Sequence, residues 1–199
     1  MIILTANTHR PQLVIMVKEP RPGRVKTRLG ATLGMTTAAW WFRHQSRAVI
    51  RRVQSPKWDT ILAVSPDVAG LTSRVWPAHL PRIAQGPGDL GQRMGRIFRG
   101  LPPGPVCIIG ADIPGIQPQH IETAFHALGR NDACFGPAAD GGYWLIGLKR
   151  SRPVPRMLFD GVRWSSKHAL ADTVKTLPGQ RVSYIATLND VDTAADLRA

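Results

Sequence analysis

Short and nearly continuous apolar runs recur along this chain, and they limit its fold more than any other feature. The first two are Leu13–Val17 (LVIMV) and Thr60–Val64 (TILAV), and a third lies within Pro105–Gly110 (PVCIIG). A run without alternating polar residues is typical of a strand that is covered on both faces, as in a parallel sheet. Segments with helical spacing lie between these runs, from about Thr36 to Gln54 and from Leu90 to Leu101. The alternation predicts a three-layer α/β fold.

Weaker patterns complete the predicted order of elements. Asp89 is placed to cap the helix that begins at Leu90. The other predicted elements are a strand at Arg82–Gln85, a helix from Pro118 that ends at Gly129, strands at Asp132–Gly136 and Tyr143–Leu148, a helix capped by Ser165 or Ser166 and reaching Leu177, a strand at Arg181–Leu188 and the start of a helix at Ala194–Leu197. No repeat or domain boundary interrupts this order, so we expect one domain over residues 1–199.

Length and cysteine usage indicate a globular protein inside the cell. No apolar run approaches the roughly 20 residues of a membrane span, and the apolar stretch within Met1–Arg10 is too short for a signal peptide. We therefore expect a cytoplasmic protein. Cys107 and Cys134 each lie within a predicted buried strand, where a free cysteine behaves as a small hydrophobe, so no disulfide framework is implied. The oligomeric state stays open.

The charge indicates an acidic partner. The chain has 26 Lys and Arg against 13 Asp and Glu, a formal net charge of +13. A nucleic-acid surface and a site for phosphorylated small molecules both fit such a charge. The arginines are spread along the chain, without a basic tail, zinc-finger spacing or the aromatic and basic signature of an RNA-recognition sheet. The distribution favours a phosphorylated small molecule over nucleic acid.

Basic residues cluster directly after the first predicted strand. The segment Lys18–Gly30 (KEPRPGRVKTRLG) includes Lys18, Lys26 and Arg28, and Gly23 gives it a flexible turn. Lysine supplies a mobile point charge and arginine a planar set of donors, which together can neutralise a diphosphate or triphosphate. The alternative is a solvated basic loop. The segment has neither the glycine spacing of a Walker A loop nor that of a Rossmann fingerprint.

Carboxylates follow several predicted strands, at the edge where open α/β sheets bind ligands. Asp112 follows the strand within Pro105–Gly110, and Asp192 follows the last predicted strand. Together they could hold Mg²⁺ or Mn²⁺, which prefer carboxylates and substrate phosphates, although turn or capping roles are alternatives. Asp140 begins an Asp-Gly-Gly loop that allows close approach of a ligand or simply makes a tight turn. It could orient an acceptor hydroxyl or take its proton. The histidines show no metal spacing.

Several motifs in order resemble one family. These motifs are KEPRPGRVKTRLG, GDLGQRM, GADIPG, GPAADGGYWLIGL, VRWSS and DVDTAADL. Together they resemble the GT-A-like nucleotide-diphospho-sugar transferase family DUF2064, described as radical-SAM/selenodomain-associated or arsenosugar-type glycosyltransferase-like proteins. The resemblance runs from about Leu13 to Leu197. It implies an α/β/α sandwich with a mixed, mainly parallel sheet, a Rossmann-like fold with a nucleotide site at the carboxyl ends of the first strands. The fold more distantly resembles guanylyltransferases of molybdenum cofactor and phospholactate metabolism.

The resemblance also implies roles for individual residues. Asp112, Asp140 and Lys26 would be catalytic, and Asp112 and Asp192 would hold the metal ion. The phosphate and nucleotide contacts would come from Lys18, Gly23, Lys26, Arg28, Gly88, Asp89, Arg93 and the neighbouring Leu90, Gly91 and Met94. The acceptor would face Gly141, Gly142, Tyr143, Trp164 and Ser165. Two departures stand out: Ile113 replaces a cysteine or small residue, and a single Asp112 replaces the usual Asp-x-Asp of glycosyltransferases.

Three functions remain open from the sequence. The first is glycosyl transfer from a nucleotide-diphospho-sugar to a small acceptor, with Mg²⁺ or Mn²⁺ as cofactor. The second is nucleotidyl transfer, in which a phosphorylated small molecule attacks a nucleoside triphosphate and pyrophosphate leaves. Both reactions place negative charge at the same metal and cationic segment, so the residues do not separate them. The third is a non-catalytic nucleotide-binding module.

Overall fold

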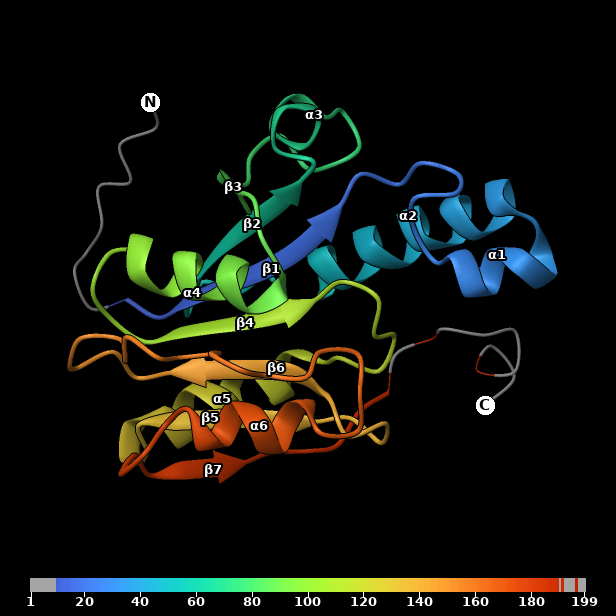
Figure 1. Ribbon diagram of the computed structural model, residues 1–199. Coiled ribbons are helices and arrows are strands. Elements are labelled where there is room, and N and C mark those ends of the chain that lie inside the picture. The colour runs from blue at the N-terminus through green and yellow to red at the C-terminus, as the bar shows by residue number, and fades with distance from the viewer. Residues whose placement is uncertain (1–9, 190, 192–195, 197–199) are drawn as a thin grey trace.

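A seven-stranded sheet forms the middle layer of the molecule (Figure 1). The computed structural model describes residues 10–189, 191 and 196. The strand order is β3-β2-β1-β4-β6-β5-β7. Among the described strands only β6 runs antiparallel to its neighbours, so the expected mixed, mainly parallel sheet is confirmed. The strands are β1 (Gln12–Lys18), β2 (Asp59–Ser65), β3 (Arg82–Ala84), β4 (Val106–Gly110), β5 (Ala133–Pro137), β6 (Tyr143–Leu148) and β7 (Val182–Tyr184).

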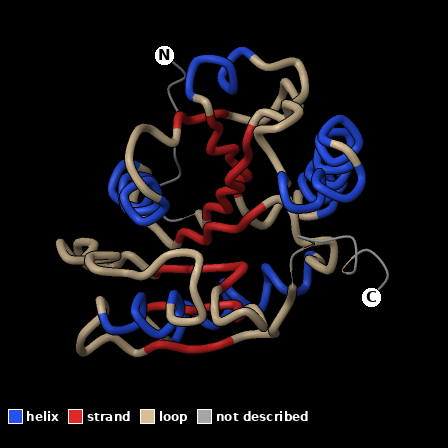
Figure 2. Tube along the Cα trace, turned by 45° about the vertical axis from the view of Figure 1, so that its right-hand side comes forward, coloured by secondary structure: helices blue, strands red, loops and turns tan. Residues whose placement is uncertain are grey.

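Helices cover both faces of the sheet, which confirms the three layers (Figure 2). The helices are α1 (Thr27–Leu33), α2 (Met35–Arg52), α3 (Asp67–Thr72), α4 (Leu90–Gly100), α5 (Pro118–Arg130) and α6 (Ala169–Lys175). Leu13 and Ile15 of β1 pack in one core with α2 and α5, whereas Val14 packs in the other core with α4 and α6. This alternation explains the continuous apolar runs, because both faces of β1 are covered. None of the helices in the described ranges is long and apolar enough to cross a membrane.

The pairing of β1 aligns the ends of three strands. β1 pairs with β2 along its whole length, up to Lys18 opposite Ser65, and with β4 up to Met16 opposite Gly110. Because these strands are parallel, the segments that follow them emerge at the same edge of the sheet. The basic segment after β1 and Asp112 after β4 therefore lie at one edge.

The boundaries of the predicted helices differ from the structure in two places. Gly129 does not end α5, which continues to Arg130; the next residue, Asn131, has extended backbone and leaves the helix. Neither Ser165 nor Ser166 caps α6, which begins at Ala169. Ser166 Oγ instead donates to the Arg163 carbonyl at 2.6 Å and accepts from the His168 amide at 3.2 Å. Its hydroxyl stabilises a turn before the helix.

Other predicted elements are confirmed, shortened or added. Asp89 caps α4 as expected, since its Oδ1 accepts from the Gln92 amide at 2.8 Å and Gln92 Oε1 accepts from the Asp89 amide at 3.0 Å. The predicted strand Arg181–Leu188 is shorter, spanning only β7. Part of the basic segment, expected to be a loop, forms the short helix α1. The predicted helix at Ala194–Leu197 falls mostly outside the described residues.

The two cysteines meet across β6. Cys107 on β4 and Cys134 on β5 both pair with Gly147 on the strand between them. Both thiols are free and buried, as expected. Burial raises the pKa of Cys107. A Cβ at Gly147 would lie 2.6 Å from Cys134 Sγ and 2.9 Å from Cys107 Sγ, so glycine leaves the space that the sulfurs occupy.

We expect Gly147→Ala to destabilise the protein by about 1–3 kcal/mol, because an added methyl in a packed core forces its neighbours to move. Gly129→Ala is the matched control, since a Cβ there meets open space on a helix, and alanine is favoured over glycine in a helix by about 1 kcal/mol. Urea unfolding followed by circular dichroism measures both. Equal stability of the two variants would contradict the packing described at Gly147.

Candidate functional site

A cavity of about 630 Å³ opens at the carboxyl edge of the sheet. One wall consists of the end of β1 and the basic segment 24–28 that follows it, together with Gly110–Ile113 after β4. The opposite wall consists of the loop before β6 and the segment Trp164–Ser166. Segments from distant parts of the sequence thus meet where strand ends create a crevice.

An ion pair joins the two strand-end segments of the first wall. Lys26 Nζ lies 2.8 Å from Asp112 Oδ2. The lysine side chain is 6% exposed and the aspartate side chain 29% exposed, so the contact is largely shielded from solvent while the carboxylate remains accessible. Lys26 has a left-handed backbone with φ of 44°, an unfavourable conformation for a residue with a Cβ. The fold therefore places this ammonium against Asp112 despite a local cost.

Further cations surround this pair. Lys18, Arg24 and Arg28 also line the cavity, so with Lys26 four basic side chains face a cavity that two carboxylates, Asp112 and Asp140, line as well. An excess of cations in a concave, partly desolvated site attracts anions such as phosphate groups.

The loop before β6 depends on glycine at one position. Gly141 has φ of 85°, and a Cβ there would lie 2.3 Å from the Lys167 carbonyl oxygen. The Gly141 carbonyl accepts from the Leu170 amide at 3.0 Å, which holds the loop against α6. The Gly142 amide donates to Asp140 Oδ1 at 2.8 Å. These contacts fix Asp140 at the rim of the cavity, with one carboxylate oxygen engaged in the turn.

Aromatic rings support the opposite wall. The centre of the Trp164 ring lies 5.9 Å from the centre of the Phe159 ring and 6.5 Å from the centre of the Tyr143 ring. It also packs against Gly91 of α4, where a Cβ would approach the indole to 2.7 Å. The Tyr143 hydroxyl lies 3.3 Å from Thr173 Oγ1, and burial raises the pKa of Tyr143 well above its ordinary value. Burial therefore favours the neutral form of the Tyr143 hydroxyl.

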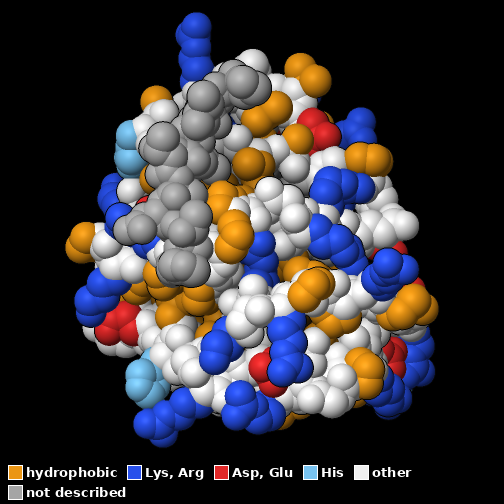
Figure 3. Space-filling view, turned by 90° about the vertical axis from the view of Figure 1, so that its left-hand side faces the viewer, with side chains coloured by type: hydrophobic (Ala, Val, Ile, Leu, Met, Phe, Trp, Pro, Cys, Tyr) orange, Lys and Arg blue, Asp and Glu red, His pale blue; other side chains and the backbone are white. Residues whose placement is uncertain are grey.

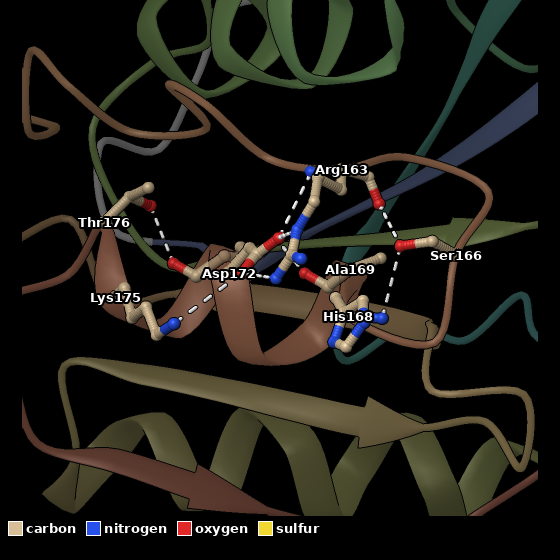
Figure 4. A network of polar contacts seen from close by, with 8 residues as sticks. Arg163, Ser166, His168, Ala169, Asp172, Lys175 and Thr176 are labelled. Atoms are coloured by element: carbon tan, nitrogen blue, oxygen red, sulfur yellow. Dashed lines mark hydrogen bonds and ion pairs between the residues drawn. The ribbon is translucent and has the colours of Figure 1, made fainter.

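A polar network holds the Trp164–Ser166 segment on α6 (Figure 4). Arg163 Nε and Nη2 donate to the two carboxylate oxygens of Asp172 at 2.7 and 3.0 Å. Lys175 Nζ lies 3.8 Å from the same carboxylate. The bidentate hydrogen bonds from Arg163 hold the pKa of Asp172 well below its usual range. Ser165 follows with a left-handed φ of 55°. The network anchors this wall although the segment lacks regular secondary structure.

The cavity gathers most of the residues proposed from the sequence. Those that line it are Lys18, Lys26, Arg28, Leu90, Met94, Asp112, Asp140, Gly142, Tyr143, Trp164 and Ser165. Gly23, Gly88, Asp89, Gly91, Arg93 and Gly141 do not line it within the described structure. Asp89 caps α4, and Arg93 Nε donates to the Gly88 carbonyl at 2.9 Å, so these residues shape the loop behind the wall. Asp192 lies outside the described residues.

Sequence reasoning assigned no role to Gln85, which lines the cavity directly after β3. Its side chain is buried, and Nε2 donates to the carbonyls of Val17 and Ala63 at 3.1 and 2.8 Å. The amide thus bridges the ends of β1 and β2. The predicted strand Arg82–Gln85 ends at this residue. A polar side chain at the carboxyl end of a strand is the sequence feature that could have indicated a place in the site.

Asp112 fits a hard divalent cation that completes its coordination with substrate oxygens. In the described part of the chain, no three His, Cys, Asp or Glu residues cluster to form a closed metal site. Mg²⁺ is typically held by one or two carboxylates, water and substrate phosphates, so a single accessible carboxylate beside several basic residues suits it. A structural zinc site would need more protein ligands.

Comparison with known proteins identifies the family and the fold. Residues 48–166 match the model of a family described as uncharacterized proteins conserved in bacteria, DUF2064. A solved structure from Desulfovibrio desulfuricans G20, provisionally called a nucleotide-diphospho-sugar transferase, is 30% identical with a TM-score of 0.82, covering 95% of this chain and 85% of that one. Among curated proteins, none matches the chain.

More distant solved structures share the fold. 4-Diphosphocytidyl-2C-methyl-D-erythritol synthase from Anaerococcus prevotii DSM 20548 has a TM-score of 0.59 at 9% identity, with 96% of each chain covered. Rv0371c from Mycobacterium tuberculosis H37Rv, in complex with manganese, has a TM-score of 0.56 at 15% identity, covering 96% of this chain and 97% of that one. At these identities the likeness concerns the fold alone.

We expect Asp172→Asn to lower the stability of the protein at neutral pH. The variant should also lose less stability than wild type as the pH falls. The folded-state pKa of Asp172 is lowered, so its ion pair contributes above the ordinary carboxyl pKa and is lost as the pH falls from about 5. Thermal unfolding of both proteins from neutral to acidic pH measures the difference. Asp160→Asn, an exposed carboxylate three residues before Arg163, is the control. Parallel pH profiles for wild type and Asp172→Asn would contradict this role.

Proposed function

The chain belongs to the DUF2064 family, and we propose that it is a transferase that uses a nucleotide-activated donor. The observation that carries this proposal is the group of Lys18, Arg24, Lys26 and Arg28 around Asp112 in one cavity. These cations are suited to nucleotide phosphates, and the carboxylate is suited to the divalent ion that accompanies them. The relative from Desulfovibrio desulfuricans supports the transferase class.

Glycosyl transfer from a nucleotide-diphospho-sugar to a small acceptor is our leading proposal. As the bond between sugar and diphosphate breaks, negative charge grows on the departing phosphate, where the basic wall stabilises it. A Mg²⁺ or Mn²⁺ ion held by Asp112, with Asp192 as its second proposed ligand, would neutralise part of that charge. Asp140, across the cavity, orients the acceptor hydroxyl or takes its proton. Trp164 and Tyr143 supply an apolar wall against which a small acceptor packs.

Nucleotidyl transfer is the second candidate. Four cations facing the cavity suit a triphosphate as well as a diphosphate, and the fold is shared with the Anaerococcus prevotii synthase. In this reaction a phosphorylated acceptor attacks the α-phosphorus of the nucleotide and pyrophosphate leaves. The same basic wall then stabilises pyrophosphate.

The surface charge gives less support to nucleic acid as the main ligand. On the face shown in Figure 3, Lys and Arg side chains are dispersed among neutral and apolar atoms rather than gathered into one stripe. A backbone-binding surface requires contiguous cations along the path of the phosphates. In its described part, this face thus offers no continuous path for a nucleic-acid backbone, and the partners that we propose are a nucleotide and a small-molecule acceptor.

Thermal unfolding with a panel of nucleotide sugars and nucleoside triphosphates, each with and without Mn²⁺, tests this proposal. A ligand that binds only the folded state raises the unfolding midpoint. At a ligand concentration of a hundred times the Kd, the free energy of unfolding rises by about 2.7 kcal/mol. We expect a metal-dependent shift with one nucleotide sugar. A shift confined to a triphosphate would select nucleotidyl transfer. Absence of any shift would contradict both glycosyl and nucleotidyl transfer. The protein would then be a binding module for some ligand other than the nucleotides tested.

We expect Asp112→Asn to lower turnover with the donor so identified by a factor on the order of 100 or more, since it removes the carboxylate that would hold the divalent ion against the departing phosphate. The measurement is product formation under saturating donor, with folding verified by circular dichroism. Asp160→Asn, at an exposed position outside the cavity lining, is the control. Full activity of Asp112→Asn would rule out the proposed metal role.

A further inference from the structure

The contact between Lys26 and Asp112 places an ammonium group against one oxygen of the carboxylate that would hold a divalent cation. Nζ and Oδ2 are 2.8 Å apart, and the lysine side chain is almost entirely buried. We propose that Lys26 competes with the divalent cation for Asp112, so that the cation binds strongly only when nucleotide phosphates draw Lys26 away. This inference rests on the proposed function and assigns it an order of assembly.

The fold holds Lys26 in this competing position. Lys26 immediately precedes α1, and Leu29 and Gly30 of that helix are buried. A Cβ at Gly30 would lie 2.6 Å from Met35 Sδ, which shows how closely α1 packs on the start of α2. The backbone of Lys26 is therefore fixed by its neighbours. Its four-carbon side chain remains the part that can change partner.

Electrostatic repulsion disfavours the presence of the Lys26 ammonium and a divalent ion at Asp112 at the same time. A divalent ion bound to Asp112 would lie within a few ångströms of Nζ as the structure places it, and like charges at that separation repel by several kcal/mol even at an intermediate dielectric constant. An ion that takes Oδ2 displaces the ammonium, which then loses its 2.8 Å contact with a shielded carboxylate. Binding of the ion is weakened by the loss of that contact unless a phosphate takes the place of the carboxylate.

A nucleotide supplies the replacement partner. Lys18, Arg24 and Arg28 line the same wall, so phosphate groups attracted there would lie within reach of Lys26. A phosphate oxygen can accept the hydrogen bonds that Asp112 gives up. Nucleotide and cation then each strengthen the binding of the other by the same factor, since such coupling is reciprocal. The site would thus bind free Mg²⁺ weakly and the metal–nucleotide pair tightly.

Titration of the full-length protein with Mn²⁺ alone tests the competition, with free Mn²⁺ followed by electron paramagnetic resonance. Lys26→Met is expected to bind Mn²⁺ more tightly than wild type, by a factor on the order of ten or more. Arg24→Met is the matched control, because it removes one positive charge from the same wall and leaves the Lys26–Asp112 contact in place. It is expected to change the affinity much less. Lys26→Arg retains the competing cation and is expected to bind weakly, like wild type.

Two outcomes would overturn the inference. Equal Mn²⁺ affinity of wild type and Lys26→Met would show that Lys26 does not compete. Equal tightening in Arg24→Met and Lys26→Met would show a general charge effect in place of a specific partner exchange. The double variant Lys26→Met/Asp112→Asn must lose the gain, which locates the ion at Asp112; retention of the gain would refute the site. Lys26→Gln repeats the test if Lys26→Met fails to fold.

This experiment is independent of the nucleotide panel. If Lys26→Met gains Mn²⁺ affinity while no nucleotide shifts the unfolding midpoint, the competition stands and the proposed function fails. If a nucleotide sugar stabilises the protein while Lys26→Met gains nothing, the proposed function stands and the competition fails.

Discussion

The parallel pairing of β1 with both β2 and β4 is the constraint on which the site depends. It brings Lys18, Ser65 and Gly110 to one edge of the sheet, because parallel strands end where their neighbours end. The antiparallel strand β6 extends this arrangement, since a strand that runs the other way begins at that edge. The loop carrying Asp140 therefore lies at the same edge of the sheet as Asp112. A one-residue change in register would turn each inward side chain to the opposite face.

The electrostatic design follows from this geometry. Four cations around a cavity repel one another, and in the described structure Asp112 relieves part of that repulsion through its contact with Lys26. A wall rich in cations is tolerable because it is open to solvent and can attract an anion. The other wall is organised differently, since Asp172 and Arg163 neutralise each other away from the cavity and leave Trp164 to present an apolar surface. One wall thus suits phosphate and the other a less charged group.

The sequence predicted those parts of the fold that depend on local pattern. The apolar runs located the central strands, and Asp89 capped α4, because burial and capping depend on neighbouring residues. Gly129 was misjudged since glycine ends a helix only where the backbone turns left-handed, and Asn131 provides another exit. The Lys26–Asp112 contact was beyond local pattern: both residues were proposed for the site, but their pairing depends on tertiary packing. Gln85 was missed for the same reason.

The single carboxylate after β4 is consistent with the presence of Lys26. Glycosyltransferases commonly carry Asp-x-Asp, whereas in this chain Asp112 is preceded two residues earlier by Gly110. A Cβ at Gly110 would lie 3.0 Å from Asp112 Oδ1, so even a small side chain would press on the carboxylate that Lys26 holds. A second carboxylate would also favour a permanently bound metal ion. With glycine there, Asp112 contacts Lys26 without a second carboxylate two residues before it, which favours exchange of the lysine for a divalent ion.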